Sequence, residues 1–299
     1  MRMINNGETA YLAVAVVLLL LLSLTLTVSA SASGPDVLFS DPALEQAVRE
    51  VLGKPSGPVS PDDLRSITEL SARELGITDL TGLEYLVNLA SLNLSGNKIE
   101  DLTPLQSLTG LKYLVLDANQ ITDISALSGL TNIEWLSLEQ NAISDISPLS
   151  SLMGMQYLAV TGNSIKDVSP LAGLQNLAVL RLAANEISEL RFGVLPSLYY
   201  LDLAGNHIGD LSPLSGLSRL EYLNLNANQI SDIGALEELT SLQALYLTGT
   251  QISDISVLTE LPNLFVVDLR DIAVLDKSSE SDSMGVIWEL EEGGVVVRY

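Results

Sequence analysis

The amino-acid sequence predicts an α/β solenoid, in which short parallel strands stack into a concave sheet and turns return the chain on the convex side. Three observations predict it. The pattern LxxLxLxxN, first complete at residues 89–97, recurs at steps of 22 residues with a single step of 21. Within each pattern, leucines alternate with variable residues, as expected of a half-buried strand. The chain has no cysteine, so stacked repeats rather than disulfides have to stabilise it.

The last residue of the pattern is asparagine in seven consecutive repeats, and Thr250 follows in the same register. A buried amide offers two N–H donors and an acceptor, which suit backbone groups left unpaired where a strand turns inward. We therefore assign these asparagines a structural role. They are Asn97, Asn119, Asn141, Asn163, Asn185, Asn206 and Asn228.

Residues 1–32 have the layout of a secretory signal peptide. Arg2 precedes an apolar run from Leu12 to Val28, and small residues follow as far as Ala32. This layout predicts cleavage after Ala32 and a secreted or cell-surface protein. The alternative is an uncleaved anchor, because a run of 17 residues is near the lower limit for crossing a bilayer. In that case the membrane is contacted only through residues 12–28.

Residues 33–66 are predicted to form a helical cap, and residues 67–272 the repeats. Asp41 and Pro42 begin an amphipathic helix that Gly53 ends, and Ser60 with Asp63 can form a capping pair for a second short helix. Such a cap covers the apolar end of the first repeat.

Residues 273–299 are predicted to form a loop and a β-hairpin cap. Two apolar runs, 285–290 and 295–299, flank a Gly-Gly pair, which is typical of a hairpin. Trp288 is expected in the core of that cap. The repeat that begins near Arg191 is one residue shorter, which should alter local curvature without disturbing its strand.

The sequence predicts no metal site, no cofactor and no catalytic residue. An acidic residue follows each pattern by four positions, from Asp101 to Asp254, but lacks the alternating oxygen ligands and glycine of a calcium loop. We interpret these acids as turn caps. The only histidine, His207, adjoins the structural Asn206, with no oxyanion hole or phosphate loop nearby. The protein is therefore predicted not to be an enzyme.

The formal net charge of −23 argues against two classes of partner. Phosphate backbones and anionic lipids both attract lysine and arginine, of which the chain has 14 against 37 acidic residues. We therefore expect no binding to nucleic acid.

The variable strand positions carry an unusual number of aromatic residues. At the third position of the pattern, five of nine residues are tyrosine or tryptophan, so stacking places them in one column. Tyrosine and tryptophan dominate binding hot spots, although aromatic cross-strand pairs also stabilise sheets, and both interpretations stay open. The predicted partner-binding residues are Tyr113, Trp135, Tyr157, Tyr200, Tyr222, Tyr246, Asp117, Glu139, Arg181 and Asp202.

The repeats resemble those of bacterial internalins, as in NQITDISALSGLTNIEWLSLEQ at residues 119–140, and the resemblance extends over about residues 36–272. It implies a leucine-rich repeat horseshoe with 3₁₀ turns on the convex side and a concave sheet that binds host or neighbouring-cell proteins. We therefore expect an exported binding module that recognises a protein partner through its concave face. The alternatives are glycan binding and an envelope-associated structural repeat without a specific ligand.

Overall fold

The computed structural model describes residues 36–299, so the predicted signal peptide or anchor lies outside the described residues. Eleven parallel strands form one sheet in which every strand pairs with its neighbours in chain order. This confirms the predicted solenoid. The strands are β1 (Glu69–Ser71), β2 (Ser91–Asn93), β3 (Tyr113–Val115), β4 (Trp135–Ser137), β5 (Tyr157–Ala159), β6 (Val179–Arg181), β7 (Tyr200–Asp202), β8 (Tyr222–Asn224), β9 (Ala244–Tyr246), β10 (Val266–Asp268) and β11 (Val296–Arg298).

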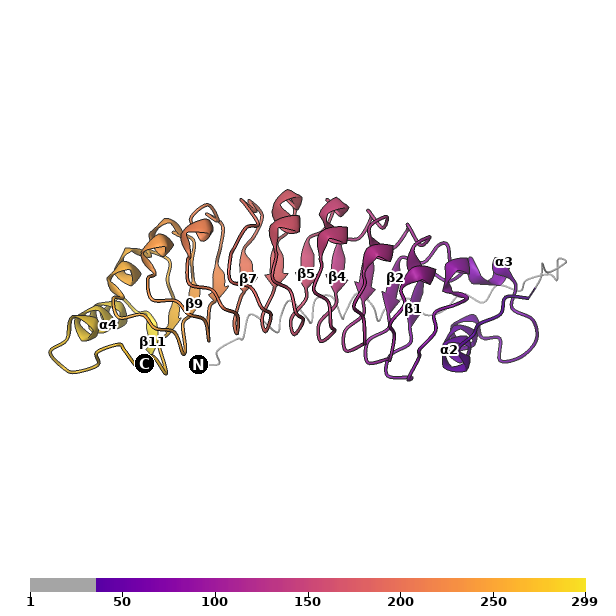
Figure 1. The fold of residues 1–299 in the computed structure, drawn as a ribbon, viewed down its shortest axis with the longest axis horizontal. Coiled ribbons are helices and arrows are strands. Elements are labelled where there is room, and N and C mark those ends of the chain that lie inside the picture. The colour runs from indigo at the N-terminus through magenta and orange to yellow at the C-terminus, as the bar shows by residue number, and fades with distance from the viewer. Residues whose placement is uncertain (1–35) are drawn as a thin grey trace. The chain divides into compact units, whose positions relative to one another are not determined.

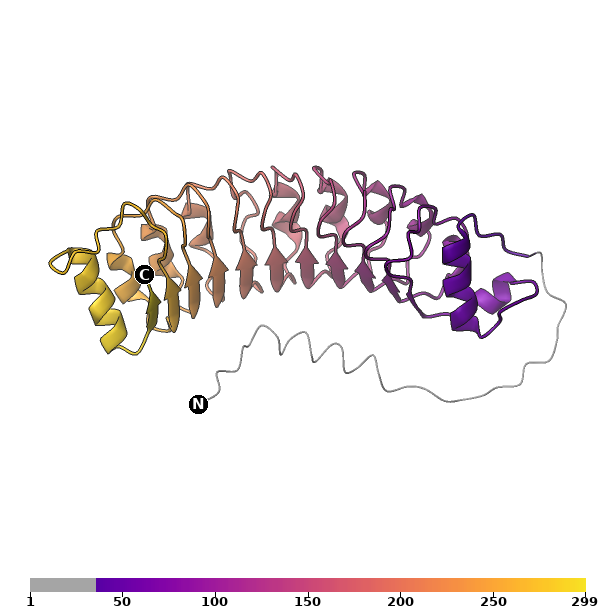
Figure 2. The same cartoon turned by 90° about the horizontal axis from the view of Figure 1, so that it is seen from below.

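Within this unit the strands line the concave side of an arc, and the 3₁₀ turns lie on the side away from them (Figure 1, Figure 2). The described repeats contain eight such turns, at most one in each repeat. They are η1 (Leu83–Tyr85), η2 (Thr103–Leu105), η3 (Ser125–Leu127), η4 (Ser147–Ser151), η5 (Ser169–Gly173), η6 (Ser212–Leu214), η7 (Gly234–Glu238) and η8 (Ser256–Glu260).

The core between strands and turns is a continuous column of leucine and isoleucine. Leu92, Leu114 and Leu136, for example, occupy equivalent central strand positions and are at most 1% exposed. Burying each such side chain contributes roughly 1.5–3 kcal/mol, which stabilises each repeat against its neighbours. Stability therefore comes from contacts between adjacent repeats.

The asparagines bond to the backbone of two adjacent turns. Asn163 is typical: its Oδ1 accepts from the Ile143 N–H at 3.0 Å, and its Nδ2 donates to the carbonyls of Leu138 and Val160. The turns joined are the residue's own and the preceding one. Thr250 makes a bond only within its own turn, to the Leu247 carbonyl.

Two features of the repeat backbone were not predicted. We call the seven structural asparagines, from Asn97 to Asn228, the asparagine ladder. The residue just before each ladder asparagine has a positive φ, whether it is a glycine such as Gly96 or a larger residue such as Gln140. In addition, Asn88, Asn132, Asn176 and Asn263 form a second set, each of which donates to a carbonyl 23 residues earlier. Since glycine is only one of several residues at the positive-φ position, no single residue type reveals that turn in the sequence.

The N-terminal cap consists of helices α2 (Pro42–Leu52) and α3 (Pro61–Leu64). Asp41 caps α2 through the N–H groups of Ala43 and Leu44, and its other oxygen accepts from the Thr78 N–H at 2.8 Å. Gly53, with φ +61°, ends the helix. The Asp41 carboxylate thus ties the cap to the first repeat.

The predicted C-terminal hairpin is wrong. Residues 285–290 lie within helix α4 (Asp282–Glu292), which Ser281 caps, and β11 pairs in parallel with β10. The buried residues Met284, Ile287 and Leu290 recur every three residues, a helical spacing that the short apolar run obscured. Trp288 is 47% exposed on α4 rather than in the core, because that spacing puts it on the outer side.

The short repeat keeps its strand in register but has no 3₁₀ turn. Leu180 pairs with Leu201 as in other repeats. Phe192, fully buried, replaces the leucine found at this point in neighbouring turns, such as Leu171.

A candidate binding face on the concave sheet

The concave face consists of the outward side chains of β3–β9, together with the residue before each of these strands and the two residues after it. Strand register places Tyr113 opposite Trp135, Trp135 opposite Tyr157, and Tyr200 opposite Tyr222. The aromatic column therefore forms as the spacing requires, with Val179 of β6 interrupting it.

Two groups of rings result. Trp135 and Tyr157 stack with their centroids 3.5 Å apart and their planes within 3°. On the other side of β6, Tyr200 and Tyr222 stack at 4.2 Å, and Tyr246 from the next column tilts onto Tyr222 at 5.2 Å. The aromatic side chains thus form two groups, which we call aromatic platforms: Tyr113, Trp135 and Tyr157 on β3–β5, and Tyr200, Tyr222 and Tyr246 on β7–β9.

The rings differ in how much surface they offer. Tyr113 is 43% exposed, Trp135 is intermediate, and Tyr157 is only 8% exposed. Burial and the neighbouring Tyr200 raise the pKa of Tyr222, so its hydroxyl stays protonated and able to donate. Where Trp135 stacks on Tyr157 and Tyr200 stacks on Tyr222, the ring faces between them are covered, and a ligand approaching these pairs meets ring edges and hydroxyls.

Charged side chains lie between the two platforms. Arg181 Nη1 lies 3.2 Å from Glu139 Oε1, so this ion pair joins β6 to the end of β4 across the small Ala159 of β5. Asp202 is 8% exposed, and burial raises its pKa, against the opposing effects of the Ala204 N–H and the Arg181 charge. The ion pair bridging a strand was not predicted, because sequence spacing alone does not pair side chains two repeats apart.

The remaining predicted polar residue, Asp117, is fixed by its own neighbours. Its Oδ1 accepts from the Ser137 hydroxyl at 2.6 Å and from the Glu139 N–H at 2.8 Å. The polar groups of the face are therefore held in place before any ligand arrives, which lowers the entropy lost on binding.

Other surfaces of the described chain are weaker candidates for a binding site. The acids that follow the repeats cap turns, except Glu189 of the short repeat, which pairs with Arg191. Asp167 Oδ1, for instance, accepts from the Ser169 N–H at 2.9 Å, and this bond, with the Ser169 hydroxyl, lowers the pKa of Asp167. Within residues 36–299, no group of three or more acidic or histidine side chains is arranged to hold a metal. His207 is exposed on a turn.

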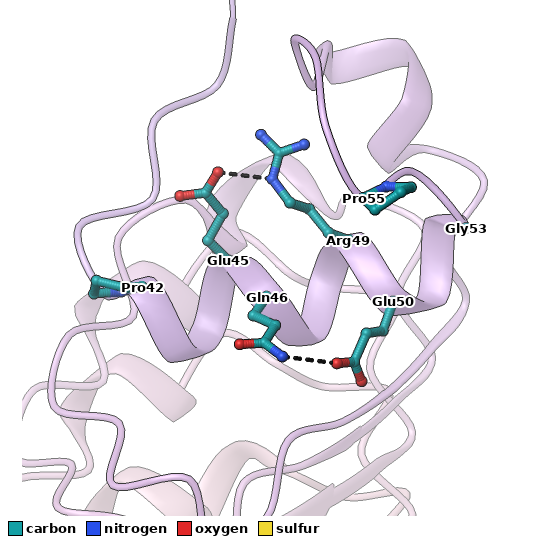
Figure 3. A pocket seen from close by; sticks show the side chains of 7 residues that line it. All are labelled: Pro42, Glu45, Gln46, Arg49, Glu50, Gly53 and Pro55. Carbon is teal, nitrogen blue, oxygen red and sulfur yellow. Dashed lines mark hydrogen bonds and ion pairs between the residues drawn. The ribbon is translucent and has the colours of Figure 1, made fainter.

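A hollow of about 590 Å³ lies on α2, apart from the concave face (Figure 3). Its polar side chains pair with one another: Arg49 Nε donates to Glu45 Oε1 at 2.8 Å, and Gln46 Nε2 to Glu50 Oε1 at 3.0 Å. This pairing leaves the hollow without a group directed at a ligand. None of the helices in the described part of the chain is long and apolar enough to cross a membrane.

Comparisons with known proteins agree with this geometry. A family profile described as leucine-rich repeats in two copies matches residues 87–129, 109–152, 196–239 and 218–263. An internalin (inlF) from Listeria monocytogenes is similar over 89% of this chain and 92% of its own, with 36% identity and a TM-score of 0.63. Internalin C2 from the same species covers 80% of this chain and 99% of its own, with 38% identity and a TM-score of 0.63.

The fold and its repeats define a leucine-rich repeat protein of the bacterial kind. More particularly, the chain belongs to the internalin family. Internalin H of Listeria monocytogenes is 42% identical over 66 residues, which cover 21% of this chain and 12% of that protein. Leucine-rich repeats of this kind typically mediate contacts between proteins.

Proposed function

We propose that this protein is exported and binds a protein on another cell, such as a host cell, through the concave face. The observation that carries the proposal is the pair of aromatic platforms on β3–β5 and β7–β9. Large rings with few rotatable bonds bury much apolar area at small entropic cost, and they dominate binding hot spots.

The orientation of the rings favours a protein over a glycan. Sugars bind aromatic residues by lying on a free ring face, whereas Trp135 and Tyr157 cover each other at 3.5 Å. Ring edges and tyrosine hydroxyls instead suit the apolar side chains and backbone groups of a polypeptide. The fixed positions of Asp117, Glu139 and Arg181 between and beside the platforms supply directional polar contacts.

The alternative of a purely structural repeat accounts for part of the column. Tyr157 is buried and its stacking on Trp135 stabilises the sheet. The same account does not explain Tyr113, which leaves 43% of its surface exposed on the same face.

A capture experiment with a matched control tests the proposal. The concave variant carries Tyr113→Ala, Trp135→Ala and Tyr246→Ala, whose rings are not fully buried. Hot-spot truncation typically costs about 2 kcal/mol or more, so we expect a roughly 30-fold or larger loss of affinity for a captured host-surface protein. Quantitative mass spectrometry of proteins captured from host membrane extracts measures the loss.

The control variant removes three exposed apolar side chains that lie outside the strands: Val87→Ala, Met153→Ala and Val194→Ala. Equal capture by both variants and the unmodified chain overturns the proposal, as does capture that free oligosaccharides displace.

A further inference from the structure

Most of the charged side chains on the concave face are carboxylates. Between the residue before β3 and the two residues after β9, the concave face carries two cations, Lys112 and Arg181. The same region carries five carboxylates, which are Asp117, Glu134, Glu139, Asp202 and Glu221.

Both cations are paired within the face itself. Lys112 Nζ lies 3.1 Å from Glu134 Oε1, joining the entries of β3 and β4. Arg181 Nη1 lies 3.2 Å from Glu139 Oε1. Each pair cancels one positive and one negative charge, so the excess carboxylates are Asp117, Asp202 and Glu221.

Asp117 and Glu221 lie beside the two platforms. Asp117 follows β3, the strand of Tyr113, and its Oδ1 accepts from the Ser137 hydroxyl and the Glu139 N–H, which are dipoles rather than cations. Glu221 is exposed immediately before Tyr222. Since dipoles orient a carboxylate without neutralising it, the negative charge at these positions faces the approaching partner.

The charge of the whole chain acts in the same direction. A formal net charge of −23 produces a field that accelerates encounter with basic proteins and repels acidic ones. An acidic partner surface placed on Asp117 or Glu221 brings like charges together in a partly desolvated interface, which disfavours binding.

We propose that the polypeptide bound by the concave face is basic: its contact surface carries more lysine and arginine than aspartate and glutamate. Its cations lie against Asp117 and Glu221, and its apolar side chains lie against the two aromatic platforms. The inference rests on the proposed function, since it concerns the partner of the same face.

The test uses a random 16-residue peptide library displayed on phage and selected on the full chain. We expect the enriched peptides to have a positive net charge and to lose binding to the Tyr113→Ala, Trp135→Ala, Tyr246→Ala variant. A second variant, Asp117→Asn with Glu221→Gln, keeps the side-chain acceptors but removes two charges. We expect it to slow peptide association about tenfold at low ionic strength.

The matched control, Glu237→Gln with Glu260→Gln, removes the same charge from the exposed turns η7 and η8. We expect it to change association less than twofold. Enriched peptides that need the aromatic residues but are neutral or acidic overturn this inference and leave the proposed function standing. Equal effects of the two charge variants also overturn it, because attraction is then a property of the whole chain. Peptides indifferent to the aromatic variant overturn the proposed function itself.

Discussion

Each asparagine of the ladder pairs three or four backbone groups that the strands and turns leave over. Asn163 accepts one N–H and donates to two carbonyls, at 2.9–3.0 Å, and it is 9% exposed. A carboxylate at this position lacks the donors, and an aliphatic side chain lacks both functions. The amide therefore has no chemical substitute of similar size.

We expect Asn163→Ala to destabilise the protein by roughly 3 kcal/mol, because each buried backbone group left unpaired costs about 1–3 kcal/mol. Denaturant titration measures the loss. The control is Asn263→Ala, since that exposed side chain makes a single bond to the Thr240 carbonyl. We expect a change below about 1 kcal/mol there. Similar losses for the two substitutions contradict a special role for the ladder.

At the scale of elements, two aspartates hold the N-terminal cap. Burial opposes ionisation of Asp41, but N–H groups of Thr78, Leu44 and Ala43 outweigh it and lower its pKa. Hydrogen bonds from Lys54 and from the Ser60 N–H lower the pKa of Asp63 from 3.8 to about 2. Both carboxyls bind fewer protons in the folded cap than in the unfolded chain.

It follows that both carboxylates stabilise the cap above their unfolded-state pKa of 3.8 and progressively less as the pH falls below it. For Asp63 this loss continues down to about pH 2. We expect amide protection in α2 and α3 to fall over this range before protection in β4–β6 falls, as measured by hydrogen exchange. The Asp41→Asn, Asp63→Asn variant should show weaker protection of the cap at neutral pH and a flatter pH dependence. Uniform loss of protection along the chain contradicts this expectation.

The two ends of the repeat array could be predicted to different extents. The N-terminal helix follows from Asp41, Pro42 and Gly53, because caps are local signals that a single side chain or φ value decides. The C-terminal helix could not be predicted in this way, because an apolar run of six residues beside glycines fits both a strand and a helix. The choice between them depended on packing of Ile287 and Leu290 against the last repeat.

At the scale of the whole molecule, the repeats behave as a row in which each contacts its neighbours, so disturbance at one end should stay there. Asp268 secures the C-terminal end. The side chain is almost fully buried. Its Oδ2 accepts from Arg270 Nη2 at 2.6 Å, and its Oδ1 accepts from Thr248 Oγ1 at 3.1 Å. Arg298 Nη1 of β11 lies 3.8 Å from Oδ2.

We expect Asp268→Ala to accelerate hydrogen exchange in α4, β10 and β11 by about tenfold, which corresponds to ~1.4 kcal/mol of local stability. Exchange in β4–β6, several repeats away, should change less than about twofold. Segment-resolved hydrogen exchange of the variant and of the unmodified protein measures both effects. Faster exchange throughout the sheet contradicts a nearest-neighbour array.

The sequence alone determined the repeat length, the strand register and the positions of the ladder asparagines, because period and alternation are properties of neighbouring residues along the chain. It also placed Tyr113, Trp135 and Tyr157 in one column. Only the tertiary structure decided which rings stack, how deeply Tyr157 is buried, and that Arg181 reaches Glu139 across a strand. Those outcomes depend on the sizes of side chains in adjacent repeats, such as Ala159, which compete for the same space on the sheet.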